Sequence, residues 1–223
     1  MTVRPVSPDD ALVAQSGGVG DIGALILAAG RSARFRAGGG EGPSKLVATL
    51  AGEPLVRHAA RAAIASRARP VVVVTGHAQA AVEAALEGLA VGFAHNADFA
   101  SGLASSLKTG IAALPRGVAG ALALLGDMPA VDAELLDRLI VAFAAAPHAL
   151  AVAPIHAGRR GNPVLLSRAL FPAIARLDGD EGARRLLRDA GPARILEVAV
   201  EGEAASFDVD TPGDLAAARN LRF

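Results

Sequence analysis

The sequence feature that most constrains the fold is a series of short apolar runs, each ending at or just before a glycine. The clearest runs span 24–29, 71–75 and 120–126. Apolar runs of this length, without polar alternation, predict strands that are buried on both faces of a sheet. Segments with helical periodicity separate them. The alternation predicts an α/β fold, with a single-domain, mostly parallel Rossmann-like sheet and helices on both faces.

The remaining elements complete the alternation. Further strands are expected at 90–94, 149–154, 195–200 and 207–209, and helices at 54–64, 78–87, 103–113 and 131–146. A last helix is expected with Thr211 as its N-cap, Pro212 at the first position and Asp214 at the third. Residues 1–21 show no period and predict a flexible leader, which leaves 22–223 as the domain. The glycine-rich stretch 36–45 is expected to have no regular structure.

Composition excludes several classes of protein. Basic and acidic residues number 22 each, and the only aromatic residues are seven phenylalanines. A nucleic-acid-binding protein normally carries a basic excess, so nucleic acid is not expected as a partner. The chain has no cysteine, which removes disulfides and thiolate zinc sites. The apolar runs are far shorter than a membrane span and no secretory signal is visible, so we expect a cytoplasmic protein without membrane contact.

A glycine- and arginine-containing loop follows the first strand, and ligands of open α/β sheets bind at the carboxyl ends of the strands. The small residues at 28–30 allow close approach of a ligand, and Arg31, Arg34 and Lys45 place three cations in one loop. These features favour a phosphate chain as the ligand. The dinucleotide motif GxGxxG and the P-loop motif are both absent. A solvated basic turn remains the alternative for this loop taken alone.

Two aspartates follow other predicted strands. Asp127 comes directly after the run 120–126, and Asp210 ends the segment 207–210. Carboxylates from two strand ends that meet in one crevice suit Mg²⁺, which takes one or two carboxylates together with substrate phosphates. A turn or cap role is the alternative for Asp127, and a structural salt bridge is at least as well supported as a ligand role for Asp208. Asp214 is assigned to capping only.

A set of motifs in a fixed order resembles a known family. The chain resembles the molybdenum cofactor cytidylyltransferase branch of the nucleotidyltransferase superfamily, from about Ile22 to the C-terminus. That resemblance implies a fold like that of the nucleotide-diphospho-sugar transferases. One departure is visible, because the segment from Arg36 to Ser44 is several residues longer than the family pattern. The motifs are LAAGRSARF (27–35), Lys45, VVTGH (73–77), Asn96, Gly102, SSL (105–107), LLGDMP (124–129), GRRGNPVLL (158–166), GDEGAR (179–184) and DVDTPGDL (208–215).

The resemblance also implies roles for individual residues. Lys45, Arg31, Arg34 and Asp127 would be catalytic, and Asp127 and Asp210 would hold Mg²⁺. The acceptor would contact Gly161, Asn162, Gly182 and Arg184. The nucleotide would contact Leu27, Ala28, Ala29, Gly30, Arg31, Ser32, Lys45, Thr75, Gly76, Gly102, Ser105 and Ser106.

The function implied is transfer of a nucleoside monophosphate, from CTP in the first instance, to the phosphate of a molybdopterin-type acceptor with release of pyrophosphate. The sequence LAAG at 27–30 favours CTP, since the guanylyl branch tends to read LAGG. A molybdoenzyme or a maturation factor would be the protein partner. Guanylyl transfer, a sugar-phosphate acceptor, and a non-catalytic nucleotide- or cofactor-binding protein remain open. A hydride-transfer enzyme is disfavoured by the missing GxGxxG motif.

Overall fold

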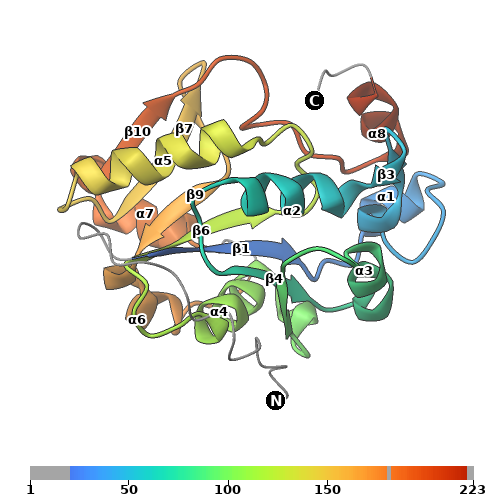
Figure 1. Ribbon diagram of the computed structural model, residues 1–223, viewed down its shortest axis with the longest axis horizontal. Coiled ribbons are helices and arrows are strands. Elements are labelled where there is room, and N and C mark those ends of the chain that lie inside the picture. The colour runs from blue at the N-terminus through green and yellow to red at the C-terminus, as the bar shows by residue number, and fades with distance from the viewer. Residues whose placement is uncertain (1–20, 180–181, 220–223) are drawn as a thin grey trace.

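The computed structural model describes residues 21–179 and 182–219, and its centre is an eight-stranded sheet (Figure 1). Seven strands follow the order β10-β7-β9-β6-β1-β4-β5, and β8 pairs with β7. Six strands run in one direction, while β8 and β9 run against it. The predicted α/β fold with a mostly parallel sheet is therefore confirmed. The strands are β1 (Ile22–Ala28), β4 (Val71–Thr75), β5 (Gly92–His95), β6 (Gly120–Leu125), β7 (Ala151–His156), β8 (Arg159–Arg160), β9 (Val164–Ser167) and β10 (Ile195–Ala199).

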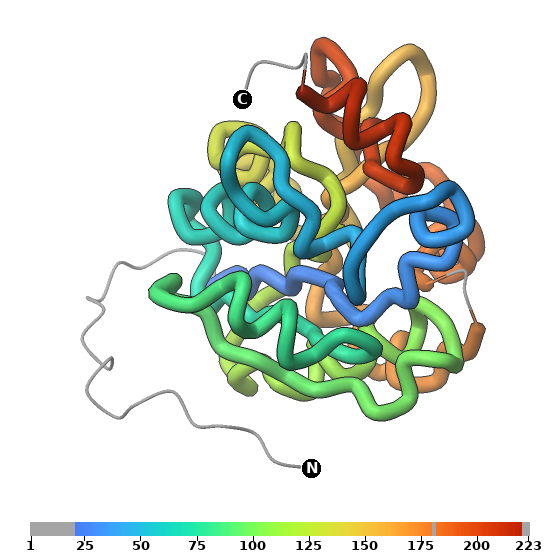
Figure 2. The backbone as a smooth tube through the Cα atoms, turned by 90° about the vertical axis from the view of Figure 1, so that its right-hand side faces the viewer, coloured from blue at the N-terminus to red at the C-terminus, as the bar shows by residue number. Residues whose placement is uncertain are grey.

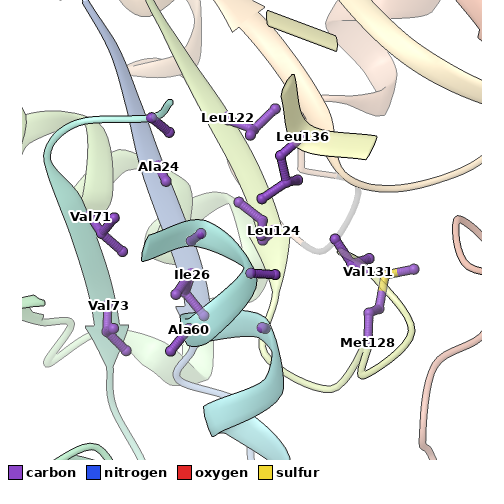
Figure 3. Packing of buried hydrophobic residues seen from close by; sticks show 14 of the residues in the cluster. Ala24, Ile26, Ala60, Val71, Val73, Leu122, Leu124, Met128, Val131 and Leu136 are labelled. Carbon is purple, nitrogen blue, oxygen red and sulfur yellow. The ribbon is translucent and has the colours of Figure 1, made fainter. Parts of the chain in front are cut away.

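Helices cover both faces of the sheet because the central strands are apolar on both sides. Helices α2 (Leu55–Ala65) and α5 (Ala133–Ala145) pack on one face, and α3 (Gln79–Ala85) adds Val82 to the same cluster. Figure 3 shows Ala24 and Ile26 of β1 lying in this cluster with Leu122 and Leu124 of β6. The other face of β1 packs on α4 (Leu103–Ala113), and α6 (Phe171–Ile174) and α7 (Arg184–Ala190) extend that side. Burial of this kind contributes about 25 cal/mol per Å² of apolar surface.

A third, smaller cluster joins two segments that are far apart in the sequence. Phe35, Leu50, Leu55, Val209 and Ala218 are buried together. They connect the segment after β1 with the C-terminal helix, which lies beside it in Figure 2. The cluster residues come from α1 (Ala33–Ala37), β2 (Thr49–Leu50), the start of α2, and α8 (Pro212–Ala218) with the segment before it. The 3₁₀ turn η2 (Lys45–Val47) and β3 (Glu53–Pro54) lie in the chain between α1 and α2. Packing of Val209 in this cluster places the aspartates on either side of it, Asp208 and Asp210, near the end of β1.

The structure differs from the sequence predictions in four places. Residues 207–209 do not form a strand; they pass the end of β6, where Val209 N donates to Asp127 O at 3.0 Å. The hairpin strand β8 and the antiparallel strand β9 were not predicted, because two residues and four residues are too short to show a period. The stretch 36–45 is not wholly irregular, since Arg36 and Ala37 end α1 and Lys45 begins η2. Strand 149–154 is shifted to 151–156.

Other predictions agree closely with the structure. The helix expected at 103–113 has those bounds. The last helix begins with a capping box, in which Thr211 accepts from the Asp214 N–H while the Asp214 side chain accepts from the Thr211 N–H. The leader assigned to 1–21 lies outside the described residues except for Asp21. Among the described helices, none is long and apolar enough to cross a membrane.

Candidate functional site

A cleft of about 540 Å³ lies at the carboxyl ends of β1 and β6. Its wall is built by the loop after β1, by η2, by the segment that leads into α4, and by three aspartates. The cleft is therefore at the edge of the sheet where the sequence predicted a ligand. Its lining residues are Leu27, Ala29, Gly30, Arg31, Ser32, Ala33, Arg34, Lys45, Leu46, Phe99, Ala100, Gly102, Leu103, Ser106, Leu125, Asp127, Asp208 and Asp210.

The loop after β1 is held closed by two serines. Ser32 has a φ of 53°, in the left-handed region, and its Oγ lies 3.1 Å from Ser44 Oγ. Ser32 Oγ also accepts a hydrogen bond from Lys45 N at 3.1 Å, and Ser44 Oγ accepts one from Leu46 N. Because both ends of the long glycine-containing excursion meet at these serines, its extra length does not displace Lys45. The lysine thus returns to the cleft directly beside the start of the loop.

Lys45 bridges two aspartates at the centre of the cleft. Its Nζ lies 2.6 Å from Asp127 Oδ2 and 2.8 Å from Asp210 Oδ1, and its side chain is only 11% exposed. Burial acts to lower the pKa of Lys45, but the charges and hydrogen bonds of Asp127 and Asp210 outweigh it, so the pKa is raised. The side chain is therefore a fixed ammonium group across the neutral pH range.

Three carboxylates meet around this ammonium group. Oxygen atoms of Asp127, Asp208 and Asp210 lie within 4.8 Å of one another. Burial and then the neighbouring charges of Asp210 and Asp127 raise the pKa of Asp208 above its usual range. Asp127 Oδ1 is buried and makes no hydrogen bond to any described residue. A set of three close carboxylates with a free acceptor oxygen fits a hard divalent cation. The sequence had placed only Asp127 and Asp210 in this role.

The three cations of the loop contact different partners. Arg34 Nη1 lies 2.5 Å from Asp210 Oδ2 at the exposed side of the cluster. The guanidinium carbon of Arg31 instead lies 5.7 Å from the centre of the Phe99 ring. Phe99 was not identified from the sequence, although it is one of only seven aromatic residues and stands between Asn96 and Gly102. The structure therefore separates Arg31 from the other two cations.

The segment between β5 and α4 supplies one wall through a buried polar network. The Asn96 side chain donates hydrogen bonds to Ser105 Oγ at 2.8 Å and to Ser106 Oγ at 3.1 Å. Ser105 Oγ donates in turn to Gly102 O at 2.8 Å, so Ser105 stabilises the turn. Gly102 has a φ of 97°, which favours glycine. Ser106 and Gly102 line the cleft, whereas Ser105 does not.

Thr75 and Gly76 were expected at the nucleotide, but they lie behind the cleft wall. Thr75 is fully buried, and its Oγ1 has no hydrogen-bond partner among the described residues. A Cβ on Gly76 would lie 2.7 Å from Ala29 Cβ and 2.8 Å from Phe99 Cβ. Gly76 is therefore required for the wall to close. Ala28, also expected at the nucleotide, is buried and does not line the cleft, and contact of all three residues with a nucleotide remains a prediction.

The residues expected at the acceptor do not line the cleft. Asn162 N donates to Ala205 O at 2.8 Å, and a Cβ on Gly161 would clash with that oxygen. Gly182 is buried next to Leu103, which does line the cleft, and Arg184 is exposed at the start of α7. Gly161 and Asn162 thus have a packing role, and contact of all four with an acceptor remains a prediction.

Comparisons with known proteins give a consistent result. Residues 24–195 match the family described as the MobA-like NTP transferase domain. The purine catabolism protein PucB of Bacillus subtilis is 31% identical over 204 residues, which are 84% of this chain and 91% of PucB. Nicotine blue oxidoreductase of Paenarthrobacter nicotinovorans is 32% identical over 195 residues, 84% of this chain and 91% of that protein.

Solved structures show the same fold. Rv0371c of Mycobacterium tuberculosis H37Rv is 27% identical and superposes with a TM-score of 0.78, covering 90% of this chain and 98% of that one. Its complex with manganese superposes with a TM-score of 0.73, at 27% identity, over 91% of this chain and 100% of that one.

Proposed function

The chain belongs to the MobA-like NTP transferase family, and we propose that it transfers a nucleoside monophosphate from CTP to the phosphate of a molybdopterin-type acceptor. A nucleotidyltransferase activity follows from the family; the base and the acceptor are the proposal. The observation that carries nucleotidyl transfer in this cleft is the cluster of Lys45, Asp127 and Asp210 at the end of the loop after β1. The ammonium group of that cluster can contact a triphosphate directly, and the carboxylates can do so through a divalent cation in the same cleft.

Asp127, Asp208 and Asp210 would hold a divalent cation, for which we propose Mg²⁺. The fit is supported by the free Oδ1 of Asp127 and by the close spacing of the three carboxylates. A manganese complex of the relative Rv0371c also agrees with a divalent site on this fold. When bound, such an ion neutralises phosphate charge and stabilises the charge that develops during transfer.

The side chains of this protein would then act by position and charge. The acceptor phosphate is already ionised near neutral pH, so its attack on the α-phosphorus needs no general base. Lys45 and Arg34 would stabilise the negative charge that grows on the leaving pyrophosphate. The loop after β1 presents small residues, and a Cβ on Gly30 would meet nothing within 4 Å, which leaves its backbone open to the phosphates. No covalent enzyme intermediate is required.

CTP and the molybdopterin-type acceptor are supported by the ordered motifs of the sequence. The segment LAAG at 27–30 forms the end of β1 and the cleft wall, and Leu27, Ala29 and Gly30 line the cleft. Guanylyl transfer is the nearest alternative, because it uses the same fold and the same charges. A pocket shaped for a pyrimidine excludes a larger purine, so the two alternatives predict opposite preferences between CTP and GTP.

Nucleotide binding is expected to stabilise the protein against heat. With Mg²⁺, a nucleoside triphosphate at a hundredfold its Kd adds about 2.7 kcal/mol to the free energy of unfolding. For a chain of this length this corresponds to a rise of roughly 5–10 °C in Tm. The measurement is a thermal melt with each of the four triphosphates, and nucleosides serve as the control. An unchanged Tm with all four would contradict the proposed function.

CTP is expected to be used in preference to GTP by roughly 30-fold. Each buried hydrogen-bond partner that the wrong base leaves unpaired costs about 1–3 kcal/mol. Two such contacts cost at least about 2 kcal/mol, and since 1.4 kcal/mol is a factor of ten, this gives roughly 30-fold or more. The test supplies molybdenum cofactor with equal CTP, GTP, ATP and UTP, and mass spectrometry identifies the dinucleotide formed. A dominant guanine dinucleotide would assign the protein to guanylyl transfer. Pyrophosphate release only with a sugar phosphate would show that the acceptor is a sugar phosphate and not a molybdopterin.

A further inference from the structure

Phe99 is the only aromatic side chain that lines the cleft in the described part of the chain. It begins a short 3₁₀ turn, Phe99–Ser101, that is anchored on both sides. Before the turn, Asp98 N donates to Asn96 Oδ1 at 3.0 Å. Behind it, Gly76 packs so closely that a Cβ there would lie 2.8 Å from Phe99 Cβ. The ring is thus held at the cleft wall while remaining partly exposed.

Arg31 lies with this ring and not with the acidic cluster. Its guanidinium carbon is 5.7 Å from the ring centre, within the range of a cation–π contact. Arg34 and Lys45 are both paired with Asp210, whereas Arg31 is exposed and forms no ion pair with any described residue. The lining of the cleft therefore has two chemically distinct parts. One part holds charges for phosphates, and the other presents an aromatic ring with a planar cation.

We propose that Phe99 and Arg31 form the platform against which the nucleobase of the triphosphate lies. The proposal rests on the proposed function, since it assigns the part of the same cleft that contacts the base. Nucleobases stack on aromatic rings and on guanidinium planes, which are the two surfaces that this pair offers. Such a platform supplies affinity for any base, because every base has a π-face. It assigns Arg31 to the base, although the sequence had grouped it with the phosphate-binding cations.

The chain contains no tryptophan and no tyrosine, which allows a direct optical test. Phe99→Trp places a single tryptophan at the platform. We expect its fluorescence to be quenched in a saturable manner by CTP with Mg²⁺, and to be unaffected by inorganic tripolyphosphate with Mg²⁺. Phe171→Trp is the matched control, because Phe171 begins α6 and does not line the cleft. Its fluorescence should stay constant with both ligands.

Affinities of a second set of variants separate the two parts of the cleft lining. Phe99→Ala and Arg31→Ala are each expected to weaken CTP binding about tenfold, which corresponds to about 1.4 kcal/mol. Their affinity for tripolyphosphate should stay within about twofold of the unmodified protein. Arg34→Ala should weaken both ligands, because it acts in the part that holds charges for phosphates. Phe99→Leu retains an apolar side chain without a π-face, so it should bind tripolyphosphate normally and CTP weakly.

The outcomes distinguish this inference from the proposed function. If the unmodified protein shows no Tm shift with any triphosphate, both are overturned. If the Tm rises with CTP while the fluorescence of Phe99→Trp and the affinity of Phe99→Ala are unchanged, only the platform is overturned. Equal weakening of CTP and tripolyphosphate by Phe99→Ala would show that the ring merely shapes the loop, and would also overturn the platform. Selective loss of CTP binding in Phe99→Ala, together with quenching of the tryptophan in Phe99→Trp, supports it.

Discussion

Replacing Lys45 with methionine is expected to lower the rate of nucleotidyl transfer by at least about 10²-fold, the scale for losing one strong electrostatic contact to a transition state. Methionine keeps a flexible apolar stem of similar shape but removes the ammonium group that contacts Asp127 and Asp210. The rate is measured as pyrophosphate release under saturating CTP, Mg²⁺ and acceptor. Unchanged turnover in Lys45→Met would contradict the assignment of this residue.

The same substitution should also lower Tm in the absence of metal. Three carboxylates would then lie together without the ammonium group that now lies between two of them. Removing one partner of a buried ion pair is destabilising because it leaves uncompensated charge. Mn²⁺ should therefore raise the Tm of Lys45→Met more than that of the unmodified protein, while activity stays low. This result would show that lysine and metal share the same carboxylates.

The chain offers a matched control for Lys45. Lys108 is the only other lysine in the sequence, and it pairs with the exposed Asp178 at 3.2 Å. An exposed pair of this kind contributes between about 0 and 1 kcal/mol. Lys108→Met should leave both turnover and the response of Tm to Mn²⁺ unchanged. If both lysine variants behaved alike, the loss of activity would reflect a general charge effect rather than the cleft.

Replacing Asp127 with asparagine is expected to reduce turnover by at least about 10²-fold with the fold intact. Asparagine keeps the shape of the side chain but removes the charge that faces Lys45 and would hold the ion. Its backbone oxygen still accepts from Val209 N, so the C-terminal segment stays in place. Asp210→Asn should behave similarly. Turnover and Mn²⁺ affinity are measured together, and both are expected to fall.

Asp214→Asn is the control for the two aspartate variants. The Asp214 carboxylate accepts from Asp210 N at 3.1 Å and from Thr211 N at 2.7 Å, so it caps α8 and does not line the cleft. The hydrogen bond from the Thr211 side chain is the largest cause that lowers the pKa of Asp214, and burial acts against it. Loss of the cap should cost on the order of 1 kcal/mol in stability, with turnover retained. Abolished activity in Asp214→Asn with normal activity in Asp210→Asn would reverse the assignment.

Features that depend only on residues close together in the chain were predictable from the sequence. Buried strands such as 71–75 show as apolar runs, and the capping box at Thr211 depends on residues three apart. Lys45 was predicted as one of the cations in the loop after the first strand, and Asp127 as the acid that directly follows the run 120–126. The ordered motifs also indicated the family that residues 24–195 match.

Features that depend on contacts between distant segments were not predictable. Strand β9 is stabilised by pairing with β6 and β7 on both sides, not by its own short sequence. Residues 207–209 have a strand-like pattern but find no partner strand, since only Val209 bonds to the chain beyond β6.

The sequence alone thus determined the central parallel strands, the edge of the sheet at which the cleft lies, and the positions of Lys45, Asp127 and Asp210 at that edge, because apolar runs and the residues that follow them are local properties. Only the tertiary structure decided which partner each of the charged side chains contacts. In the structure, Asp208 belongs to the acidic cluster, Thr75 is buried, and Arg31 lies against the Phe99 ring. The physical reason is that the direction of a side chain in a cleft is set by packing between segments, here between the loop after β1, the turn before α4 and the C-terminal segment.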